Sequence, residues 1–160
     1  MVKINTCVFI SGTGSNLKYL IKNSREYNFP IKIAQVYTNK KNAPGLIYAK
    51  KYSIPFKVIN LQDKLFEVKI LDEIKKKKIL LICLAGYMKI LSKKFIKNFN
   101  GKIINIHPSL LPKYKGINTF SRILKKSFNI LKNENEKSLR KKTQNFEYRA
   151  FSEAIIKLFR

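Results

Sequence analysis

The only histidine of the chain lies in the segment Asn105-Ile106-His107-Pro108, two positions after an asparagine. Side chains two residues apart on an extended backbone point to the same face. An amide N–H can stabilise an oxyanion that develops on a carbonyl, and an imidazole can move protons at neutral pH. Asn105 and His107 are therefore candidate catalytic residues for attack on a carbonyl carbon. The alternative is that His107 merely fills a core position.

A second candidate site is the glycine-containing segment Ser-Gly-Thr-Gly-Ser-Asn-Leu at residues 11–17. Backbone N–H groups at a helix N-terminus bind anions, and glycines allow a phosphate to approach closely. The pattern is not a dinucleotide fingerprint, because Leu17 stands at the third glycine position, and no Walker A lysine follows. A phosphate loop and a plain tight turn are both open interpretations. Ser15 and Asn16, which suit a helix N-cap and phosphate bonding, favour the phosphate loop.

These segments must be positioned by the elements around them. Apolar runs rich in β-branched residues predict strands, and stretches of helical character lie between them. The expected strands are 4–10, 31–37, 56–59, 79–84 and 102–106, and the expected helices are 15–27, 45–51, 64–78 and 93–98. This alternation predicts an α/β fold, a doubly wound, Rossmann-like and mostly parallel sheet with helices on both faces. Asn105 and His107 then follow the last strand, at the edge where such folds bind ligands.

With 160 residues, the chain is long enough for one domain. We expect a Rossmann-like core over 1–120, a shortened irregular segment over 121–142 and a C-terminal helix over 143–160. An apolar stripe at helical spacing predicts that this helix packs on the sheet. The stripe consists of Phe146, Ala150, Phe151, Ala154, Ile155, Leu158 and Phe159.

Composition narrows the class of protein. The content of 45% hydrophobic residues excludes a disordered chain, and no apolar run is long enough to span a membrane. Cys7 and Cys83 lie in apolar runs and are expected to be buried thiols, not a disulfide or a zinc site. We therefore expect a soluble, cytoplasmic protein that binds no metal.

The formal net charge of +25 raises the possibility of a nucleic-acid partner. Nearly all of the positive charge is lysine, however, whereas bidentate recognition of bases and phosphates favours arginine. A solvated lysine-rich surface is the favoured interpretation, and nucleic-acid binding remains the alternative. Such a positive field would still attract anionic small molecules.

Three motifs, at residues 8–17, 84–91 and 105–112, resemble the phosphoribosylglycinamide formyltransferase family of purine synthesis in their order and spacing. They are Val-Phe-Ile-Ser-Gly-Thr-Gly-Ser-Asn-Leu, Leu-Ala-Gly-Tyr-Met-Lys-Ile-Leu and Asn-Ile-His-Pro-Ser-Leu-Leu-Pro. The third motif is shared with other folate-dependent formyltransferases, including methionyl-tRNA formyltransferase, whereas the glycine loop is typical of the ribonucleotide branch. The resemblance extends from residue 3 to about residue 120.

The resemblance implies formyl transfer from 10-formyltetrahydrofolate to the amine of 5′-phosphoribosylglycinamide, in the pathway to IMP. It implies that Asn105 contacts the formyl oxygen and that His107 donates a proton, with no metal and no covalent enzyme intermediate. The ribonucleotide would contact Gly12, Thr13, Gly14, Ser15, Asn16 and Leu17, and the pteridine would contact Met88, Lys89, Ile90 and Leu91. Gln144 and Glu147 match a Gln-x-x-Glu segment that touches the ribonucleotide, and their spacing places them on one helical face. The oligomeric state, monomer or homodimer, stays open.

The chain departs from the family between residues 120 and 138. It lacks a Thr-Val-His strand and an Asp-x-Gly turn, whose aspartate raises the pKa of the catalytic histidine in the family. The aspartates of this chain, Asp63 and Asp72, lie far upstream, and Glu134 and Glu136 are more typical of solvated charges. We therefore expect an exposed sheet edge and a weakened folate side. The alternative function is a catalytically impaired relic or a nucleotide-binding module of the same fold.

Overall fold

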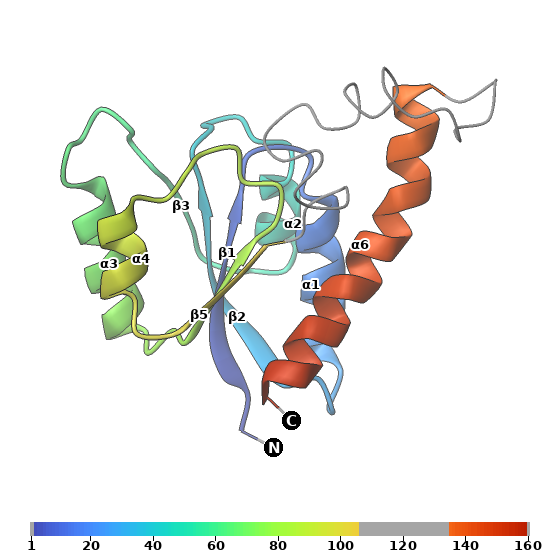
Figure 1. The fold of residues 1–160 in the computed structure, drawn as a ribbon, viewed down its shortest axis with the longest axis horizontal. Coiled ribbons are helices and arrows are strands. Elements are labelled where there is room, and N and C mark those ends of the chain that lie inside the picture. The colour runs from blue at the N-terminus through green and yellow to red at the C-terminus, as the bar shows by residue number, and fades with distance from the viewer. Residues whose placement is uncertain (1, 106–134, 160) are drawn as a thin grey trace.

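The computed structural model describes residues 2–105 and 135–159. A five-stranded sheet forms the centre, in the order β3-β2-β1-β4-β5, and every neighbouring pair is parallel. The strands are β1 (Ile4–Ile10), β2 (Ile31–Thr38), β3 (Phe56–Val58), β4 (Leu81–Leu84) and β5 (Lys102–Asn105). The predicted α/β fold with a parallel sheet is confirmed (Figure 1). Within the described residues β5 is an edge strand, paired with β4 alone.

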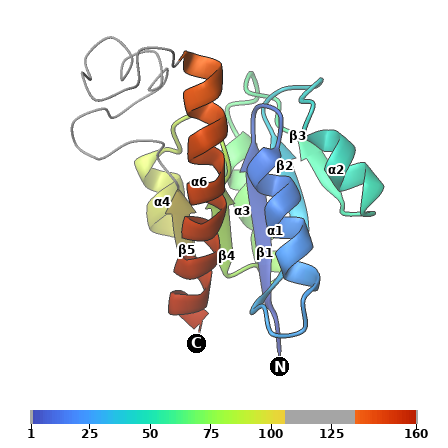
Figure 2. The same ribbon diagram turned by 90° about the vertical axis from the view of Figure 1, so that its right-hand side faces the viewer.

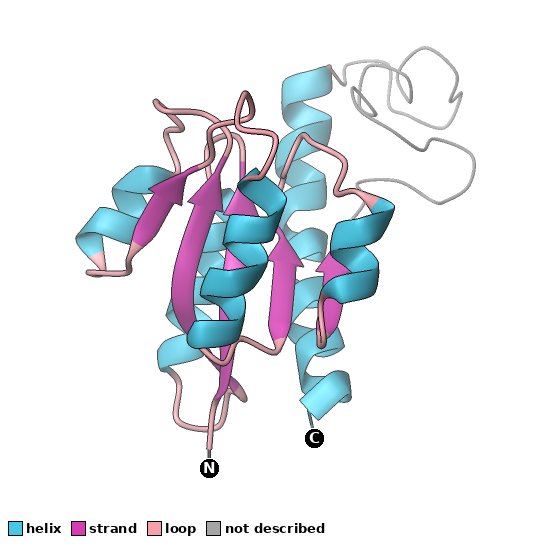
Figure 3. Ribbon diagram, turned by 90° about the vertical axis from the view of Figure 1, so that its left-hand side faces the viewer, coloured by secondary structure: helices cyan, strands magenta, loops and turns pink. Residues whose placement is uncertain are grey.

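Helices connect the strands and cover both faces of the sheet (Figures 1 and 3). They are α1 (Ser15–Arg25), α2 (Leu46–Lys51), α3 (Phe66–Lys76), α4 (Lys93–Asn98) and α6 (Glu136–Phe159). The helix α3 ends earlier than expected because Lys78 adopts a positive φ of 50° and its N–H bonds to the carbonyl of Lys75. The helix α6 begins seven residues before the expected position 143. The sequence of its first turns is mostly polar and has no apolar stripe from which a helix could be predicted. Its Glu, Lys, Leu and Arg residues nevertheless have high helix propensity.

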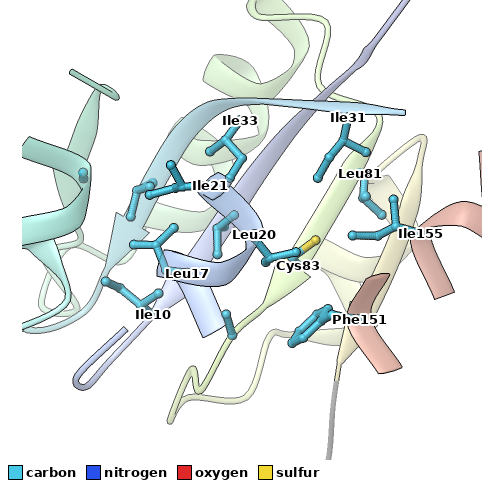
Figure 4. Close-up of a cluster of buried hydrophobic side chains, with 14 of the residues drawn as sticks. Ile10, Leu17, Leu20, Ile21, Ile31, Ile33, Leu81, Cys83, Phe151 and Ile155 are labelled. Atoms are coloured by element: carbon cyan, nitrogen blue, oxygen red, sulfur yellow. The ribbon is translucent and has the colours of Figure 1, made fainter. Parts of the chain in front are cut away.

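Successive residues of the central strands enter different cores, as a sheet covered on both faces requires. On β1, Val8 and Ile10 pack with α1, α2 and α6, whereas Cys7 and Phe9 pack with α3 and α4. Figure 4 shows the first of these cores, in which side chains of α1 and α6 meet those of β1, β2 and β4. Cys7 and Cys83 are buried free thiols as predicted, and burial raises the pKa of both.

The helix α6 docks beside α1 on this face (Figure 2). Phe151 and Ile155 are fully buried in the first core, where Ile155 lies beside Leu81 and Phe151 lies near Cys83 (Figure 4). The predicted stripe is wrong at Phe146, Ala150 and Leu158, which are exposed. Aromatic stacking extends the contact instead, because the rings of Tyr19 and Tyr148 lie 4.5 Å apart and nearly parallel.

On the opposite face, α3 is tied to the sheet by the carboxylate of Glu73. The buried Tyr37 hydroxyl of β2 donates to Glu73 over 2.9 Å, and Lys57 of β3 forms a salt bridge with it. Burial tends to raise the pKa of Glu73, but these two hydrogen bonds and the charges of Lys57 and Lys77 together hold the pKa below its usual value. Burial and the carboxylate together raise the pKa of Tyr37 well above its ordinary value.

Candidate active site

The candidate site lies where the strand order reverses. After β1 the chain adds β2 and β3 on one side, and it later adds β4 and β5 on the other. In α/β sheets the crevice beyond the carboxyl ends of the strands at such a point binds ligands. Register places Phe9 opposite Leu84 and Leu84 opposite Asn105, so β1, β4 and β5 end at a common level. In the chain, the three motifs lie at or directly after the ends of these strands, and the third runs beyond the described residues.

The loop after β1 leads directly into the N-terminus of α1. Gly14 is the N-cap, in the left-handed conformation with φ 70°, and no side chain caps this end within the described part of the chain. The expectation that Ser15 or Asn16 would be the N-cap is therefore wrong. With Gly14 as the cap, the first N–H groups of the helix lack a side-chain acceptor, which is the arrangement that binds anions.

A second glycine presses against this loop from α2. A Cβ built on Gly45 would lie 2.8 Å from Gly14 Cα and 2.9 Å from Ile10 Cδ1, and the N–H of Gly45 donates to the carbonyl of Gly12. A Cβ on Gly14 would lie 2.6 Å from Gly45 Cα. By contrast, Gly12 has open space where its Cβ would be. Two backbones in direct contact thus set the shape of the loop.

The side chain of Asn16 joins this loop to the C-terminal helix. Its Nδ2 donates to Glu147 Oε2 of α6 over 2.8 Å, across 131 positions of the chain. Asn16 is only 8% exposed, and its Oδ1 has no hydrogen-bond partner among the described residues. A buried acceptor without a partner is costly, so this oxygen suits a donor brought by a ligand. Gln144 lies one turn before Glu147 on α6 and is half-buried.

Two of the predicted binding residues contribute their side chains to the core. Leu17 is fully buried in the first core, and Leu91 is buried in the second. Leu17 therefore has only its backbone N–H to offer a ligand. Thr13 is exposed, and Gly12 and Ser15 are half-exposed, so these residues remain accessible at the loop.

The loop after β4, residues 85–91, is anchored at its start on β1. The N–H of Ala85 donates to the carbonyl of Phe9, and the ring of Tyr87 packs edge-on against Phe9 at 5.2 Å. Burial, helped by the Glu67 carboxylate, raises the pKa of Tyr87 to about 12, so its phenol stays protonated at neutral pH. Beyond Tyr87 the loop offers exposed apolar side chains, with Ile90 at 98% and Met88 half-exposed.

Of the candidate catalytic pair, the structure places Asn105 and not its partner. Asn105 is the last residue of β5 and is exposed at the carboxyl edge of the sheet. His107 and Glu134 lie outside the described residues, as does the side chain of Glu136. Asp63 is elsewhere, before α3, where hydrogen bonds from Lys69 and the Leu65 N–H hold its pKa below the usual value. Asp72 belongs to α3 itself.

Two residues that shape the site, Asn39 and Gly45, carried little signal of their own in the sequence. Ser11 and Asn39 hydrogen-bond to each other, and Gly45 packs on Gly14. A glycine directly before a helix was the one available hint, since glycine is tolerated at such positions. Ser11 belonged to the motif, yet its partner Asn39 lies in an unremarkable segment 28 positions away.

No group of three His, Cys, Asp or Glu side chains that could hold a metal occurs in the described ranges 2–105 and 135–159. Over the same residues, no helix has the length and apolar character needed to cross a bilayer.

Known proteins resemble this chain in sequence. The chain is 47% identical over 121 residues to "Phosphoribosylglycinamide formyltransferase" of Haemophilus influenzae, covering 73% of this chain and 57% of that protein. It is 43% identical over 131 residues to the human "Trifunctional purine biosynthetic protein adenosine-3", covering 76% of this chain and 12% of that protein. The chain thus spans little more than half of the bacterial relative and a small part of the human one.

Solved structures resemble it over nearly its whole length. The phosphoribosylglycinamide formyltransferase from Brucella melitensis superposes with a TM-score of 0.90 at 31% identity, covering 98% of this chain and 95% of that one. The enzyme of the same name from Anaplasma phagocytophilum gives 0.84 at 29% identity, covering 94% and 83%. The sequence profile described as "Formyl transferase" matches residues 4–126. On these grounds the chain belongs to the formyl transferase family.

Proposed function

We propose that this chain transfers a formyl group from 10-formyltetrahydrofolate to the amine of 5′-phosphoribosylglycinamide, a step of purine biosynthesis leading to IMP. The observation that carries the proposal is the Asn16–Glu147 pair at the uncapped N-terminus of α1. It combines an anion site with a buried acceptor that has no described partner, which together match a phosphate and a nearby hydroxyl or amine donor. The names of the relatives supply the identity of the ribonucleotide.

In this proposal the two loops hold the two substrates on either side of the reversal point. The ribonucleotide phosphate sits on the N–H groups of residues 12–17, and Gln144 and Glu147 of α6 contact other parts of the ribonucleotide. The pteridine lies against Met88, Lys89 and Ile90, and Leu91 supports this loop from the core. The burial of the exposed apolar side chains under the ring system would contribute affinity.

The reaction needs an oxyanion donor and a proton carrier. The substrate amine attacks the formyl carbon, forming a C–N bond and a tetrahedral intermediate whose oxygen accepts a hydrogen bond from Asn105. His107 takes a proton from the attacking amine as a general base and then gives it to the folate nitrogen as a general acid, and the bond from the carbon to that nitrogen breaks. This scheme uses no metal.

The direct test is formyl transfer from 10-formyltetrahydrofolate to glycinamide ribonucleotide by the whole chain. We expect turnover by the wild type and a loss of about 100-fold or more in kcat for His107→Ala and Asn105→Ala, the size of typical acid–base and oxyanion terms. Asn100→Ala is the matched control for Asn105→Ala, because Asn100 is also exposed and precedes the opposite end of β5. Its kcat should equal that of the wild type.

The outcome also separates the proposal from its alternative. A folded wild type without turnover that still binds the ribonucleotide in calorimetry would contradict formyl transfer and indicate a nucleotide-binding module. Binding of arbitrary RNA that weakens steeply with salt would point to the nucleic-acid alternative. The same preparation, run in a sedimentation experiment, distinguishes a monomer from a homodimer.

We infer that the protein works in the cytoplasm, since both cysteines are buried free thiols that fit a reducing compartment. Fractionation of cells and detection of the chain with an antibody would check this location.

A further inference from the structure

The hydroxyl of Ser11 joins three loops at the reversal point of the sheet. Ser11 directly follows β1 and is only 2% exposed. Its Oγ accepts a hydrogen bond from the backbone N–H of Met88 over 2.8 Å, in the loop after β4. Its own proton goes to Oδ1 of Asn39, which directly follows β2.

The direction of these two hydrogen bonds means that Asn39 orients the Ser11 hydroxyl. A serine hydroxyl has one proton to donate and two lone pairs to accept with, and it rotates freely unless a partner fixes it. Because Asn39 takes the proton, a lone pair of Ser11 faces the N–H of Met88. Asn39 therefore acts on Met88 through Ser11, without touching the Met88 loop itself by any hydrogen bond among the described residues.

The bond from the Met88 N–H to Ser11 lies in a part of the loop that has few other hydrogen bonds. Residues 86–91 form no other hydrogen bond to the described part of the chain, and Gly86 has a positive φ of 75°. The flanks are fixed, by the N–H of Ala85 on Phe9 and by Ser92, whose N–H donates to Glu67 over 2.9 Å. Between these anchors Tyr87 and Leu91 pack against the second core, and the bond from Met88 N–H to Ser11 is the hydrogen bond that fixes the backbone between them.

We propose that Ser11, oriented by Asn39, is a positioning residue that holds the Met88 segment in the conformation that receives the formyl donor. The inference rests on the proposed function, because it assigns the Met88 loop to the folate. It predicts an asymmetric defect: loss of the hydroxyl weakens binding of the folate and leaves binding of the ribonucleotide unchanged, since α1 and α6 hold that side independently.

The test compares Ser11→Ala, Asn39→Ala and Asn39→Asp with the wild type. The removal of one hydrogen bond corresponds to roughly a three- to tenfold effect. For Ser11→Ala we expect the KM for 10-formyltetrahydrofolate and the Kd for tetrahydrofolate to rise by about this factor, with the KM for the ribonucleotide within twofold. Asn39→Ala should give a smaller rise, Asn39→Asp should restore wild-type values because it keeps the acceptor, and the double alanine variant should equal Ser11→Ala.

Amide hydrogen exchange supplies a readout that does not depend on activity. The N–H of Met88 should exchange faster in Ser11→Ala, while the N–H of Ala85 keeps its protection. Ser24→Ala is the matched control, since Ser24 donates to a backbone carbonyl within α1, away from the crevice. It should change neither KM nor the exchange at Met88.

Three outcomes would overturn the inference: equal rises in both KM values, unchanged exchange at Met88, or full additivity of the two alanine variants. A wild type without turnover would overturn the proposed function, and the tetrahydrofolate Kd and the Met88 exchange would then decide the role of Ser11 alone. A wild type that binds no tetrahydrofolate would overturn both.

Discussion

The loops after β1 and after β4 lie side by side at the reversal point, yet they are built differently. The loop after β1 is enclosed by distant parts of the chain, with Gly45, the residue before α2, against its backbone and Glu147 of α6 bonded to Asn16. The loop after β4 is fixed at its base and leaves Met88 and Ile90 exposed. A small anion needs preformed donors, whereas a flat ring system needs apolar surface that stays uncovered until it binds. The two loops suit these two tasks.

The largest expected effect comes from weakening the packing of α6 on α1. This helix also supports the loop after β1, through the hydrogen bond between Glu147 and Asn16. Phe151 is 1% exposed in the core that joins α6 to α1, so Phe151→Ala should lower the free energy of unfolding by about 3–5 kcal/mol. It should also weaken ribonucleotide binding, because Glu147 reaches Asn16 from the same helix. Urea unfolding and calorimetric titration with the ribonucleotide measure the two effects.

Phe146→Ala is the control for this prediction, because Phe146 is on the same helix and 72% exposed. It should shift the free energy of unfolding by less than about 0.5 kcal/mol. Equal losses from both variants would show that α6 does not pack as the structure has it.

A smaller effect is expected from the backbone contact beneath the first loop. Gly45→Ala places a methyl group within 3 Å of Gly14 Cα, and overpacking of this kind costs about 1–3 kcal/mol. The methyl group added by Gly12→Ala would have no atom within 4 Å, so this variant should leave the midpoint of thermal unfolding unchanged. Ribonucleotide binding by Gly12→Ala would then sharpen the comparison, since weaker binding would locate the ligand in the open space above Gly12. Equal midpoints for both variants would contradict the close approach.

The contrast between the loops also explains what the sequence could predict. The strands could be predicted because β1 and β4 consist largely of apolar residues that face both layers of helices. The position of the crevice followed from the alternation of strands and helices along the chain. The partner of Asn16 was not readable: local spacing favoured a cap, whereas the side chain bonds to Glu147, 131 positions away. The apolar stripe on α6 was only partly right for a similar reason: helical periodicity gives a face but not how much of it the rest of the chain covers, and Phe146, Ala150 and Leu158 are exposed.

In the loop after β4, Ile90→Ser should lower the affinity for folate without lowering the stability of the fold. Ile90 is 98% exposed, so its loss should change the free energy of unfolding by less than about 0.5 kcal/mol. If the folate covers it, the Kd for tetrahydrofolate should rise by roughly tenfold, as expected for the burial of an aliphatic side chain. Ile47→Ser on α2, also exposed and apolar, is the matched control and should leave this Kd unchanged. Unchanged folate affinity in Ile90→Ser would remove the second loop from the site.

The smallest expected effect is a loss of unfolding free energy at acid pH. It concerns α3, which holds the end of the loop after β4 and, among the described residues, has no hydrogen bond to the loop after β1. The loop after β4 is held at its end by Glu67 of α3, and α3 is tied to β2 and β3 through Glu73. The folded state holds the pKa of Glu73 below its usual 4.5, so its stabilising contribution is complete above that pH and is lost as the pH falls further. Because Glu73 is partly exposed, we expect a contribution of at most about 1 kcal/mol. Urea unfolding of the wild type should therefore weaken between pH 5 and pH 3 more steeply than that of Glu73→Gln, which has no proton to gain. Parallel curves would show that Glu73 has the same proton affinity in the folded and the unfolded state, and that its bonds to Tyr37 and Lys57 add no net stability of this kind.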